Sequence, residues 1–586
     1  MSISINIAAS RINGVAPLAV FFDATATTLS GSYLDATFLW DFDNTNVDPS
    51  ALYKVGSGFV IGHVFPNPGT YTVSLTVWDS AGQTATSTVQ VTVSAFSGTT
   101  YYVALSGSDS NDGLSMAHPL LTANYAIGTI AYYAGPNTQI LFRNGDTFYT
   151  PFNNCNGRPG PVIISNYIDP GSPSNVLPTI YSTEVDGAWQ VLLIGNDWRI
   201  MNLKVRSGGD TISDPRYPGG IQTSNTTINS LIYRIVESYL GADGGPVIYG
   251  RYNAVVECDI SRCDGGGYSS PAGGSVNDSN FIIGNYVHDM DHGNQHAFRL
   301  QTGSKFFFGF NNIDHAYDNF NSVTIQGNTD QIVIYKNIIN GELSFQPQNL
   351  NSAAEYVHHC VADSNLLIGR TEAGYERQQA LAVVAKDIVI RNNIIYNYNF
   401  GIGIDKDSVV GPSARVKVYH NTVITGVTDS NCAFSDVDTT CIDVEFYNNI
   451  LLDVGIDDGS SIDFLQMRNG DILDGASDYN IMYGSGWNPA TVQLFPSETL
   501  AAWVSATGND THSSIVDPLL VSTNVASTNL AKLQSSSPAI GTGKFVGNLL
   551  DYYQAVRSGV TSIGATEEVT TVIVPRSLCK RFAKRK

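Results

Sequence analysis

Short runs of alternating apolar and polar residues fill positions 3–94. The runs are PLAVFFDATAT, TFLWDFDN, TYTVSLTVWDSAG and TSTVQVTVSAF, and turn residues separate them. A period of two residues in runs of this length predicts a β-sandwich. We expect Tyr71, Val73, Leu75 and Val77 to share its inward face, with Trp40 at the centre of its core.

A second pattern starts near residue 280, where one short phrase recurs: FIIGNYVHD, FFGFNNIDH, IVIYKNIIN, VADSNLLIG, IVIRNNIIY, VKVYHNTVI and VEFYNNILL. One asparagine in each phrase aligns at intervals of 25 to 28 residues: Asn285, Asn312, Asn337, Asn365, Asn393, Asn421 and Asn449. Such a unit is too short to close a core alone, so the period predicts a solenoid of stacked strands. We expect the asparagines to tolerate the left-handed backbone of a tight corner and to form a hydrogen-bonded ladder.

The composition is typical of a β-rich protein that works outside a cell. Charged residues make up 14% of the 586 positions and the formal net charge is -21, which argues against broad nucleic-acid binding. No window reaches the ~18–20 consecutive apolar residues of a membrane span. The start, MSISINIAAS, lacks the features of a secretory signal. Together these points predict a location on a virion surface or outside the cell.

The segments APLAVFFDATAT, WDFDN and HVFPNPGTYTVSLTVWDSAG resemble a polycystic-kidney-disease (PKD) domain, an immunoglobulin-like module. Asp43 stands where that family usually has glycine after WDF. The resemblance implies a spacer or a weak binding module rather than a catalyst.

The recurring phrases resemble those of right-handed parallel β-helix proteins of the pectate-lyase-like and phage tailspike superfamily. Residues 101–127 with ILFRNGDTF resemble the cap and first coil of that superfamily, and 533–567 resemble its closing stretch. The superfamily includes lyases, hydrolases, epimerases and inert spikes, so the resemblance implies a fold and not an activity.

We therefore predict an all-β chain with four parts. Residues 1–95 form the PKD-like β-sandwich and 96–100 a linker. Residues 101–567 form the right-handed parallel β-helix, and 568–586 a basic tail in which six of the last eleven residues are Lys or Arg. The tail is either a solvated end or an electrostatic contact for an acidic partner.

The best candidate for chemistry is the stretch NYVHDMDHGNQHAF, residues 285–298. His288 and His315 each follow an aligned asparagine by three residues, and three aspartates recur at intervals of 27. Stacked coils would place neighbouring carboxylates ~5 Å apart and the outer pair ~10 Å apart, which suits a retaining or an inverting glycosidase. The predicted catalytic residues are Asp264, Asp291, Asp318, His288, His315 and Arg299, with Arg299 placed to neutralise a uronate carboxylate.

Two alternatives remain for this cluster. In a lyase, the stacked aspartates would hold a calcium ion, which is the one cofactor that the sequence suggests. In the other interpretation, the aspartates are the solvated polar corner of a rod and bind nothing. The seven cysteines are scattered without metal-binding spacing and predict buried thiols, so we predict no transition-metal site.

Further polar and aromatic residues near the same coils are candidates for contact with a sugar chain. These predicted substrate-binding residues are Asp243, Tyr239, Tyr268, Tyr317, Glu372 and Arg377.

The long open face of a solenoid suits a polymer, so the leading hypothesis is a virion or secreted protein that binds a cell-surface polysaccharide and cleaves it as a lyase or hydrolase. Resemblance to tailspikes implies a homotrimer and contacts with other virion proteins. The alternatives are a non-enzymatic spike or decoration protein and a bacterial surface adhesin.

Overall fold

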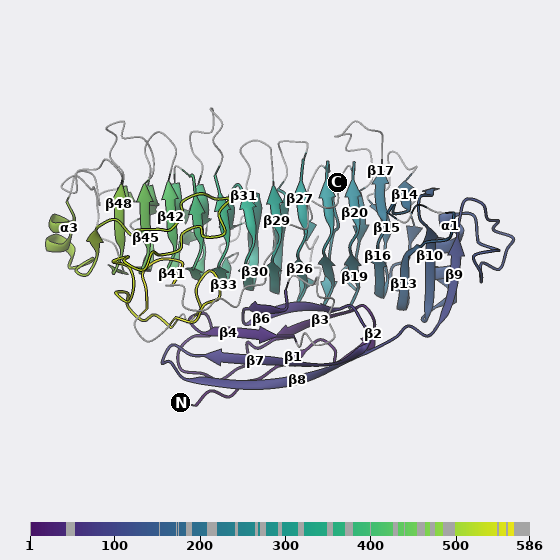
Figure 1. Ribbon diagram of the computed structural model, residues 1–586, viewed down its shortest axis with the longest axis horizontal. Helices are drawn as coiled ribbons and strands as arrows, with labels where there is room; N and C mark the ends of the chain where they lie inside the picture. Colours follow the sequence, from purple (N-terminus) through teal and green to yellow (C-terminus); the bar gives the residue numbers. More distant parts are fainter. Residues whose placement is uncertain are drawn as a thin grey trace.

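A β-sandwich lies along one side of a solenoid in the computed structural model (Figure 1). The described residues are 2–42, 53–151, 153–171, 173, 175–182, 190–207, 219–240, 244–263, 268–269, 277–290, 296–314, 322–347, 356–369, 379–398, 400–408, 410–425, 432–438, 440–453, 463–468, 475–484, 499–547, 550–557 and 561–567. Within these ranges, no helix combines the length and the apolar character of a membrane span.

The first domain is the predicted β-sandwich. One sheet has the strand order β1 (Ala8–Ala9), β3 (Leu18–Asp23), β6 (Val60–Phe65). The other has the order β2 (Asn13–Val15), β8 (Thr84–Ser94), β7 (Gly69–Trp78), β4 (Thr37–Asp41), β5 (Val55–Ser57). The side chains predicted to point inward are fully buried, which confirms that part of the prediction: Trp40, Tyr71, Val73, Leu75 and Val77.

The rest of the described chain is a parallel β-helix with three long sheets, which we name A, B and C. Sheet A contains β9 (Thr99–Val103), β10 (Thr138–Arg143), β13 (Pro159–Tyr167), β16 (Asn196–Met201), β19 (Leu231–Tyr233), β22 (Ala254–Val256), β26 (Phe281–Ile283), β33 (Val357–Asp363), β36 (Lys386–Arg391), β41 (Ala414–Tyr419), β44 (Ile442–Tyr447) and β47 (Gly475–Asp478).

Sheet B contains β12 (Asn153–Asn154), β15 (Gln190–Leu193), β18 (Gly219–Gln222), β24 (Tyr268–Ser269), β32 (Leu343–Gln346), β35 (Gln379–Val383), β38 (Phe400–Ile404), β43 (Cys432–Asp438) and β46 (Asp463–Arg468). Two long strands pass from sheet B into sheet A, β28 (Phe298–Gly309) and β30 (Val323–Tyr335). The short strands β21 (Gly250–Arg251) and β25 (Asn277–Asp278) lie at the bend between the two sheets, and β39 (Lys406–Asp407) pairs with β40 (Gly411–Pro412).

Sheet C has fourteen strands: β11 (Thr147–Thr150), β14 (Thr179–Ser182), β17 (Lys204–Ser207), β20 (Val236–Ser238), β23 (Asp259–Ser261), β27 (Tyr286–His288), β29 (Asn312–Asp314), β31 (Ile338–Asn340), β34 (Leu366–Ile368), β37 (Ile394–Tyr396), β42 (Thr422–Thr425), β45 (Ile450–Asp453), β48 (Ile481–Gly484) and β49 (Ser514–Ile515).

Stacked apolar side chains fill the interior of the solenoid. Buried residues of sheet A share one register over many coils: Ile200, Ile232, Val255, Ile282, Phe308, Ile334, Ala362, Ile390, Val418 and Phe446. The strands of sheet A also carry apolar residues between these positions, because the outer face of the sheet is covered by the sandwich.

The corner between sheets A and C carries the predicted asparagine ladder, but one residue of the alignment was wrong. The backbone N–H and the Nδ2 of Asn285 both donate to Asn311 Oδ1 at 2.9 Å. Asn312 instead begins β29. The ladder consists of Asn285, Asn311, Asn337, Asn365, Asn393, Asn421, Asn449 and Asn480.

The left-handed corner residue is not the ladder asparagine, so that part of the prediction is wrong. It is the residue before each ladder asparagine: Gly284, Phe310, Lys336, Ser364, Asn392, His420, Asn448 and Tyr479. The asparagines themselves contribute the amide ladder, in which each Oδ1 accepts bonds from the preceding coil. Cys258 takes the ladder position one coil earlier, and its N–H donates to Asn285 Oδ1 at 2.9 Å.

The sandwich packs on the outer face of sheet A and shares an apolar core with it. Phe281, Phe307 and Val333 belong to one buried cluster with residues of β3 and β6. Gly62 of β6 is so close to Phe281 that a Cβ there would lie 2.0 Å from its ring. Hydrogen bonds also cross the interface. Two arginines of the solenoid donate to sandwich carbonyls: Arg199 to Val15 and Pro17, and Arg391 to Leu34 and Ala36. Three further side-chain pairs are Lys305 with Asp23, Tyr53 with Glu257, and Lys417 with Asp35.

The sandwich is therefore fixed to the solenoid by its whole flank, unlike a module that hangs from a flexible spacer. The segment predicted as a linker, 96–100, is short, since β9 already begins at Thr99.

Helical segments lie at the two ends of the solenoid. At one end, α1 (Ala123–Tyr125), the π-helical turn η2 (Ala126–Ala131) and α2 (Tyr132–Ala134) follow one another, and Thr122 caps the first of them by accepting from the N–H of Tyr125. At the other end lies α3 (Leu500–Thr507), which buries Trp503 (Figure 1). Residues after α3 return along the solenoid, and Leu530, Ala531 and Ala565 pack on Leu366, Ile394 and Ile424.

Candidate functional site

The bend between sheets B and A repeats at the same place in successive coils. One residue there has a left-handed backbone, six positions before the ladder residue: Tyr252, Ser279, Lys305, Gln331, His359, Asp387, Arg415 and Asp443. A left-handed L-residue costs roughly 1–2 kcal/mol, and here it turns the chain from one sheet to the next. Because the turn recurs in register, the side chains just before it stack from coil to coil.

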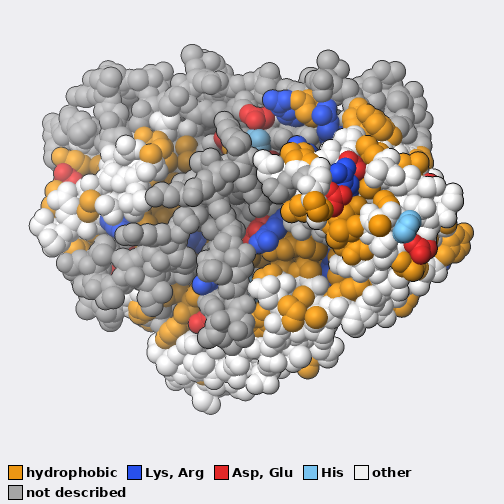
Figure 2. All heavy atoms as spheres, turned by 45° about the vertical axis from the view of Figure 1, so that its right-hand side comes forward, with side chains coloured by type: hydrophobic (Ala, Val, Ile, Leu, Met, Phe, Trp, Pro, Cys, Tyr) orange, Lys and Arg blue, Asp and Glu red, His pale blue; other side chains and the backbone are white. Residues whose placement is uncertain are grey.

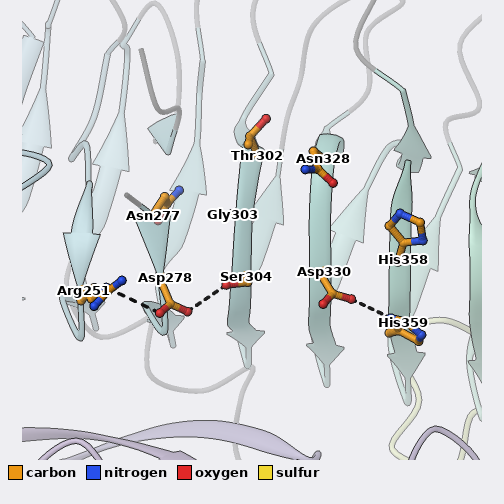
Figure 3. A pocket seen from close by; sticks show the side chains of 10 residues that line it. All are labelled: Arg251, Asn277, Asp278, Thr302, Gly303, Ser304, Asn328, Asp330, His358 and His359. Carbon is orange, nitrogen blue, oxygen red and sulfur yellow. Dashed lines mark hydrogen bonds and ion pairs between the residues drawn. The ribbon is translucent and has the colours of Figure 1, made fainter. Parts of the chain in front are cut away.

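Five polar side chains form such a stack, and we call them the bend row. Arg251, Asp278, Ser304, Asp330 and His358 occupy one register on consecutive coils. They line an open groove of about 610 Å³, the bend groove (Figure 3). Its remaining lining residues are Asn277, Thr302, Gly303, Asn328 and His359. Apart from Gly303, every lining residue carries a polar side chain.

The first half of the bend row is held by hydrogen bonds to one carboxylate. Asp278 Oδ1 accepts from Ser304 Oγ at 2.9 Å and from Ser279 Oγ at 3.0 Å. Its Oδ2 lies 3.6 Å from Arg251 Nε (Figure 3). These contacts hold the Asp278 carboxylate between the neighbouring coils, with 26% of its side chain exposed to the groove.

The second half contains a carboxylate–imidazole pair. His359 Nδ1 lies 2.7 Å from Asp330 Oδ1, and this hydrogen bond raises the pKa of His359 above its usual value. Burial instead lowers the pKa of His358, whose ring centroid is 6.0 Å from that of His359. Two adjacent imidazoles with opposite pKa shifts favour different protonation states at the same pH, which is typical of acid–base pairs.

Residues of the sandwich contact the solenoid next to the bend groove. Tyr33 of the sandwich lies beside His359, with ring centroids 6.2 Å apart, and its hydroxyl accepts from Gln331 Nε2 at 3.3 Å. Lys305, which follows Ser304 of the bend row, reaches Asp23 of β3 at 2.7 Å. The docked domain therefore contacts residues next to the bend row on several coils.

Acidic and basic side chains lie next to one another in small groups over the face drawn in Figure 2. Among the side chains coloured in that view, acidic groups lie beside basic ones in local pairs. Among the described residues, no group of three or more His, Cys, Asp or Glu side chains is arranged to hold a metal ion.

Arg299 is a predicted catalytic residue. It lies on the outer face of sheet B, on the strand β28, which continues to Ser304 at the bend groove. Its Nε and one terminal nitrogen donate to Gln326 Oε1 at 3.0 and 2.6 Å. On the same strip of sheet B, Thr324 Oγ1 lies 2.9 Å from His296 Nδ1. Arg299 is thus part of a polar surface on the coil that also carries Ser304.

His288 lies apart from this surface, on sheet C. Its Nε2 is 2.9 Å from Asp259 and its Nδ1 is 2.8 Å from Asp289. Burial alone would lower the pKa of His288, but these hydrogen bonds raise it above its usual value. Its register partner on the next coil is Asp314, so the predicted stacking of His288 on His315 is wrong, because it depended on the misaligned Asn312.

Tyr239 lies farther along the edge of sheet C and is stacked with cations. The guanidinium carbons of Arg206 and Arg262 lie 4.4 and 5.2 Å from its ring centroid. The two arginines cover part of the ring, and the contact of Tyr239 with a sugar stays a prediction from the sequence.

The other predicted site residues lie outside the described residues: Asp243, Asp264, Asp291, His315, Tyr317, Asp318, Glu372 and Arg377. The backbone of Tyr268 is described in β24, where it pairs with Arg299, but its side chain lies outside the description.

Asp278, Asp330, His358 and His359 are not among the residues predicted from the sequence, although the repeat contains a signal for them. Each bend-row residue precedes a ladder residue by seven positions, as Asp330 precedes Asn337. The predicted site residues follow the ladder asparagines in the sequence, whereas the bend row precedes them.

Comparison with known proteins gives a family for the first domain. Residues 6–93 match the family described as PKD domain. This segment is a PKD domain. No curated protein sequence matches the chain.

Three solved structures are similar to this chain over 61–84% of its length. The GH136 lacto-N-biosidase from Eubacterium ramulus is 13% identical, with 66% of this chain and 68% of that chain covered and a TM-score of 0.39. The Family 28 exopolygalacturonase of Yersinia enterocolitica is 9% identical, with 84% and 97% covered and a TM-score of 0.43. The Dettilon tailspike protein is 12% identical, with 61% of each chain covered and a TM-score of 0.30. Similarity at this level concerns the fold alone.

Proposed function

We propose that the bend groove binds a polysaccharide chain laid along the solenoid axis. The observation that carries this proposal is the bend row, five polar side chains in register that line one open groove. At ~4.8 Å per coil, the four steps from Arg251 to His358 span ~19 Å. An open polar groove of that length suits several consecutive sugar units better than a small molecule, which is usually held in an enclosed and more apolar pocket.

The proposed chemistry is hydrolysis between two carboxylates of the bend row. Asp278 and Asp330 lie two coils apart, so their strands are ~10 Å apart. This spacing is nearer to the ~6.5–9.5 Å of inverting glycosidases than to the ~5 Å of retaining ones. One carboxylate would take a proton from a water molecule while the oxygen of that water attacks the anomeric carbon. The other would give a proton to the glycosidic oxygen as that C–O bond breaks.

His359 supports the assignment of Asp330 to proton transfer, because the two groups share a short hydrogen bond. A proton given up by Asp330 can be replaced through His359, whose imidazole is protonated over a wider pH range than usual.

The aspartates Asp264, Asp291 and Asp318 remain a second proposal for the same function. Each precedes a strand of sheet B by a few residues, and Arg299 lies on that sheet. In a lyase they would bind calcium beside a uronate, as predicted from the sequence. A virion location and a homotrimeric assembly also remain predictions from the sequence.

Product analysis tests the proposal and separates the two rows. Alginate, polygalacturonate, dextran and bacterial O-chain polysaccharides are each incubated with the purified chain. Parallel samples contain Asp278→Asn/Asp330→Asn, the triple Asp264, Asp291, Asp318→Asn variant, and the control Asp443→Asn, which lies at the same bend several coils away.

Shortened saturated chains from the wild type and the control, with at least a tenfold loss in the bend-row variant, support the proposed hydrolase. If only the triple variant loses the cleavage activity, and the wild-type products have unsaturated ends, the site lies at Asp264, Asp291 and Asp318 and the reaction is an elimination. If every polymer stays intact and none binds, the solenoid is a rod and the proposal is wrong.

A further inference from the structure

The bend row has a companion row next to it in the chain. Each bend-row residue is followed directly by the left-handed residue of its own coil. We call these five companions the left-handed row: Tyr252, Ser279, Lys305, Gln331 and His359. Because each pair shares a peptide bond, a contact that holds a member of the left-handed row also limits the position of the groove residue before it.

The PKD domain contacts the left-handed row on one coil after another. The ring centroid of Tyr252 lies 6.4 Å from that of Phe21 in β3. Lys305 Nζ lies 2.7 Å from Asp23 Oδ2 at the end of the same strand. The last two members of the row share one partner, Tyr33, which lies between β3 and β4.

Tyr33 contacts both coils that carry the carboxylate–imidazole pair. Its hydroxyl accepts from Gln331 Nε2 at 3.3 Å, and Gln331 follows Asp330 directly. Its ring centroid lies 6.2 Å from that of His359, with an angle of 42° between the rings. Asp330 and His359 face each other across neighbouring strands (Figure 3). One side chain of the PKD domain therefore contacts the chain next to the carboxylate and also the imidazole.

Tyr33 is itself packed into the interface between the two domains. Its ring lies edge-on to that of Phe59, with centroids 4.9 Å apart, and Phe59 is fully buried. A Cβ on Gly58 would lie 2.9 Å from Val333, which belongs to the same strand as Asp330. Burial raises the pKa of Tyr33 to about 12, so the hydroxyl is neutral at ordinary pH. Tyr33 therefore acts on the pair by its position and adds no charge.

His359 lies between two carboxylates, and its orientation decides which of them it bonds. Its Nδ1 is 2.7 Å from Asp330 Oδ1, whereas its Nε2 is 4.0 Å from Asp387 Oδ2. Arg415 donates to both oxygens of Asp387 at 2.6 Å, which fixes that carboxylate. Because 42% of the His359 side chain is exposed, solvent alone leaves the imidazole room to turn away from Asp330. The contact with Tyr33 limits that rotation.

We propose that Tyr33 is a positioning residue of the bend groove, through which the docked PKD domain holds His359 on Asp330. The consequence for catalysis rests on the proposed function, in which Asp330 transfers a proton and His359 replaces it. In this account the PKD domain is neither a spacer nor a separate binding module. It is part of the proton-transfer site, which is complete only while the domain is docked.

The direction of a change in the His359 titration separates positioning from simple cover. The hydrogen bond to Asp330 raises the pKa of His359, and burial lowers it. If Tyr33 holds the pair together, its removal weakens the hydrogen bond and the midpoint falls toward the ordinary value. If Tyr33 only shields the imidazole from water, its removal raises the midpoint. The titratable and charged groups around His359 are Asp330, His358, Asp387, Arg415 and Tyr33.

Titration of the full chain by NMR tests the proposal without any substrate. The ¹H–¹³C signals of His359 are assigned by their loss in His359→Gln. Tyr33→Ala removes the ring and the hydroxyl, and Tyr33→Phe keeps the ring but removes the hydrogen bond to Gln331. The matched control is Tyr53→Phe, which removes a tyrosine hydrogen bond across the same interface, to Glu257 at the corner between sheets A and C.

We expect the His359 midpoint to fall by about 0.5 pH units or more in Tyr33→Ala, by less in Tyr33→Phe, and not to move in the control. Tyr33 is not among the residues that line the groove, so it should affect catalysis and not glycan binding. On a polymer that the wild type cleaves, kcat should fall about tenfold in Tyr33→Ala while KM stays within about twofold. Thermal midpoints establish that each variant is folded.

A His359 midpoint that stays the same or rises in Tyr33→Ala would overturn the proposal, and so would an equal fall in the Tyr53→Phe control. If Tyr33→Ala does not fold, the sign of the change in Tyr33→Phe decides in the same way. If the midpoint falls as expected but the wild type cleaves no polymer, the proposed function fails and Tyr33 still positions the pair.

Discussion

His359 Nδ1 lies 2.7 Å from Asp330 Oδ1, so the two side chains form an ion pair whenever the imidazole is protonated. The hydrogen bond raises the pKa of His359, and stability from the pair is fully present below the ordinary histidine pKa, near 6.5. It is lost as the pH rises through the raised pKa. Both side chains are more than 40% exposed, so the contribution is below about 1 kcal/mol.

Titration of the two neighbouring histidines tests this pairing. In the wild type, we expect the ¹H–¹³C signals of His359 to titrate above 6.5 and those of His358 below it, because burial lowers the pKa of His358. Asp330→Asn should bring the midpoint of His359 down toward 6.5. If Asp330→Asn leaves that midpoint unchanged, the pair does not form in solution.

The ladder register predicts different effects for two adjacent asparagines. Asn311 is fully buried and its Oδ1 accepts two hydrogen bonds from Asn285, whereas Asn312 starts a strand and is only partly buried. Asn311→Ala leaves buried partners unsatisfied and should lower the free energy of unfolding by about 2–4 kcal/mol. Asn312→Ala should cost less than about 1 kcal/mol. Equal losses in urea denaturation would contradict the register described above.

A buried glutamate predicts a pH dependence of stability. Glu237 points into the solenoid, where its Oε1 accepts from the N–H of Ile221, and burial raises its pKa to about 8 from 4.5. Because the folded state holds this proton more tightly, the contribution of Glu237 to stability is fully present below pH 4.5 and falls as the pH rises toward 8. The total fall is on the order of a few kcal/mol.

Glu237→Gln keeps the shape of the side chain and removes its titration. Denaturation midpoints at pH 5 and pH 8.5 should differ less in this variant than in the wild type, with the variant relatively more stable at the higher pH. An unchanged pH dependence would mean that Glu237 is ionised in the folded protein.

The packing of the PKD domain on sheet A predicts that the two domains unfold together. Gly62→Val places a Cβ where the ring of Phe281 lies, so the variant should separate the domains locally and lower the thermal midpoint. Thr84→Val on the far strand is the matched control and should leave the midpoint within about 2 °C, since exposed changes cost under about 0.5 kcal/mol. Calorimetry of the wild type should show one transition, and two well-separated transitions would contradict a shared core.

Much of the fold follows from patterns that depend on local sequence. Alternation in TYTVSLTV placed Tyr71 and Leu75 inside correctly, because a strand has a period of two. The asparagine period predicted the coils, but FNNIDH contains two adjacent asparagines and nothing local distinguishes Asn311 from Asn312. That one-residue shift moved His315 opposite His288, where the structure has Asp314.

The candidate site was harder to predict because it depends on register across coils. Asp278 and Asp330 are separated by a serine coil, so no aspartate period of one coil marks them. The contact between Tyr33 and His359 joins positions more than 300 residues apart, and no spacing in the repeat predicts it. A resemblance to PKD domains implied the sandwich but not its position against the groove.

The proposed function places a polysaccharide in the bend groove. Hydrogen–deuterium exchange with and without fragments of the polymer that binds in the panel above measures the position of that chain directly. We predict slower exchange in peptides covering residues 250–252, 277–280, 302–305, 327–331 and 357–360, with little change on sheet C. Protection confined to sheet C or to the loops before sheet B, with the bend unchanged, would contradict the claim.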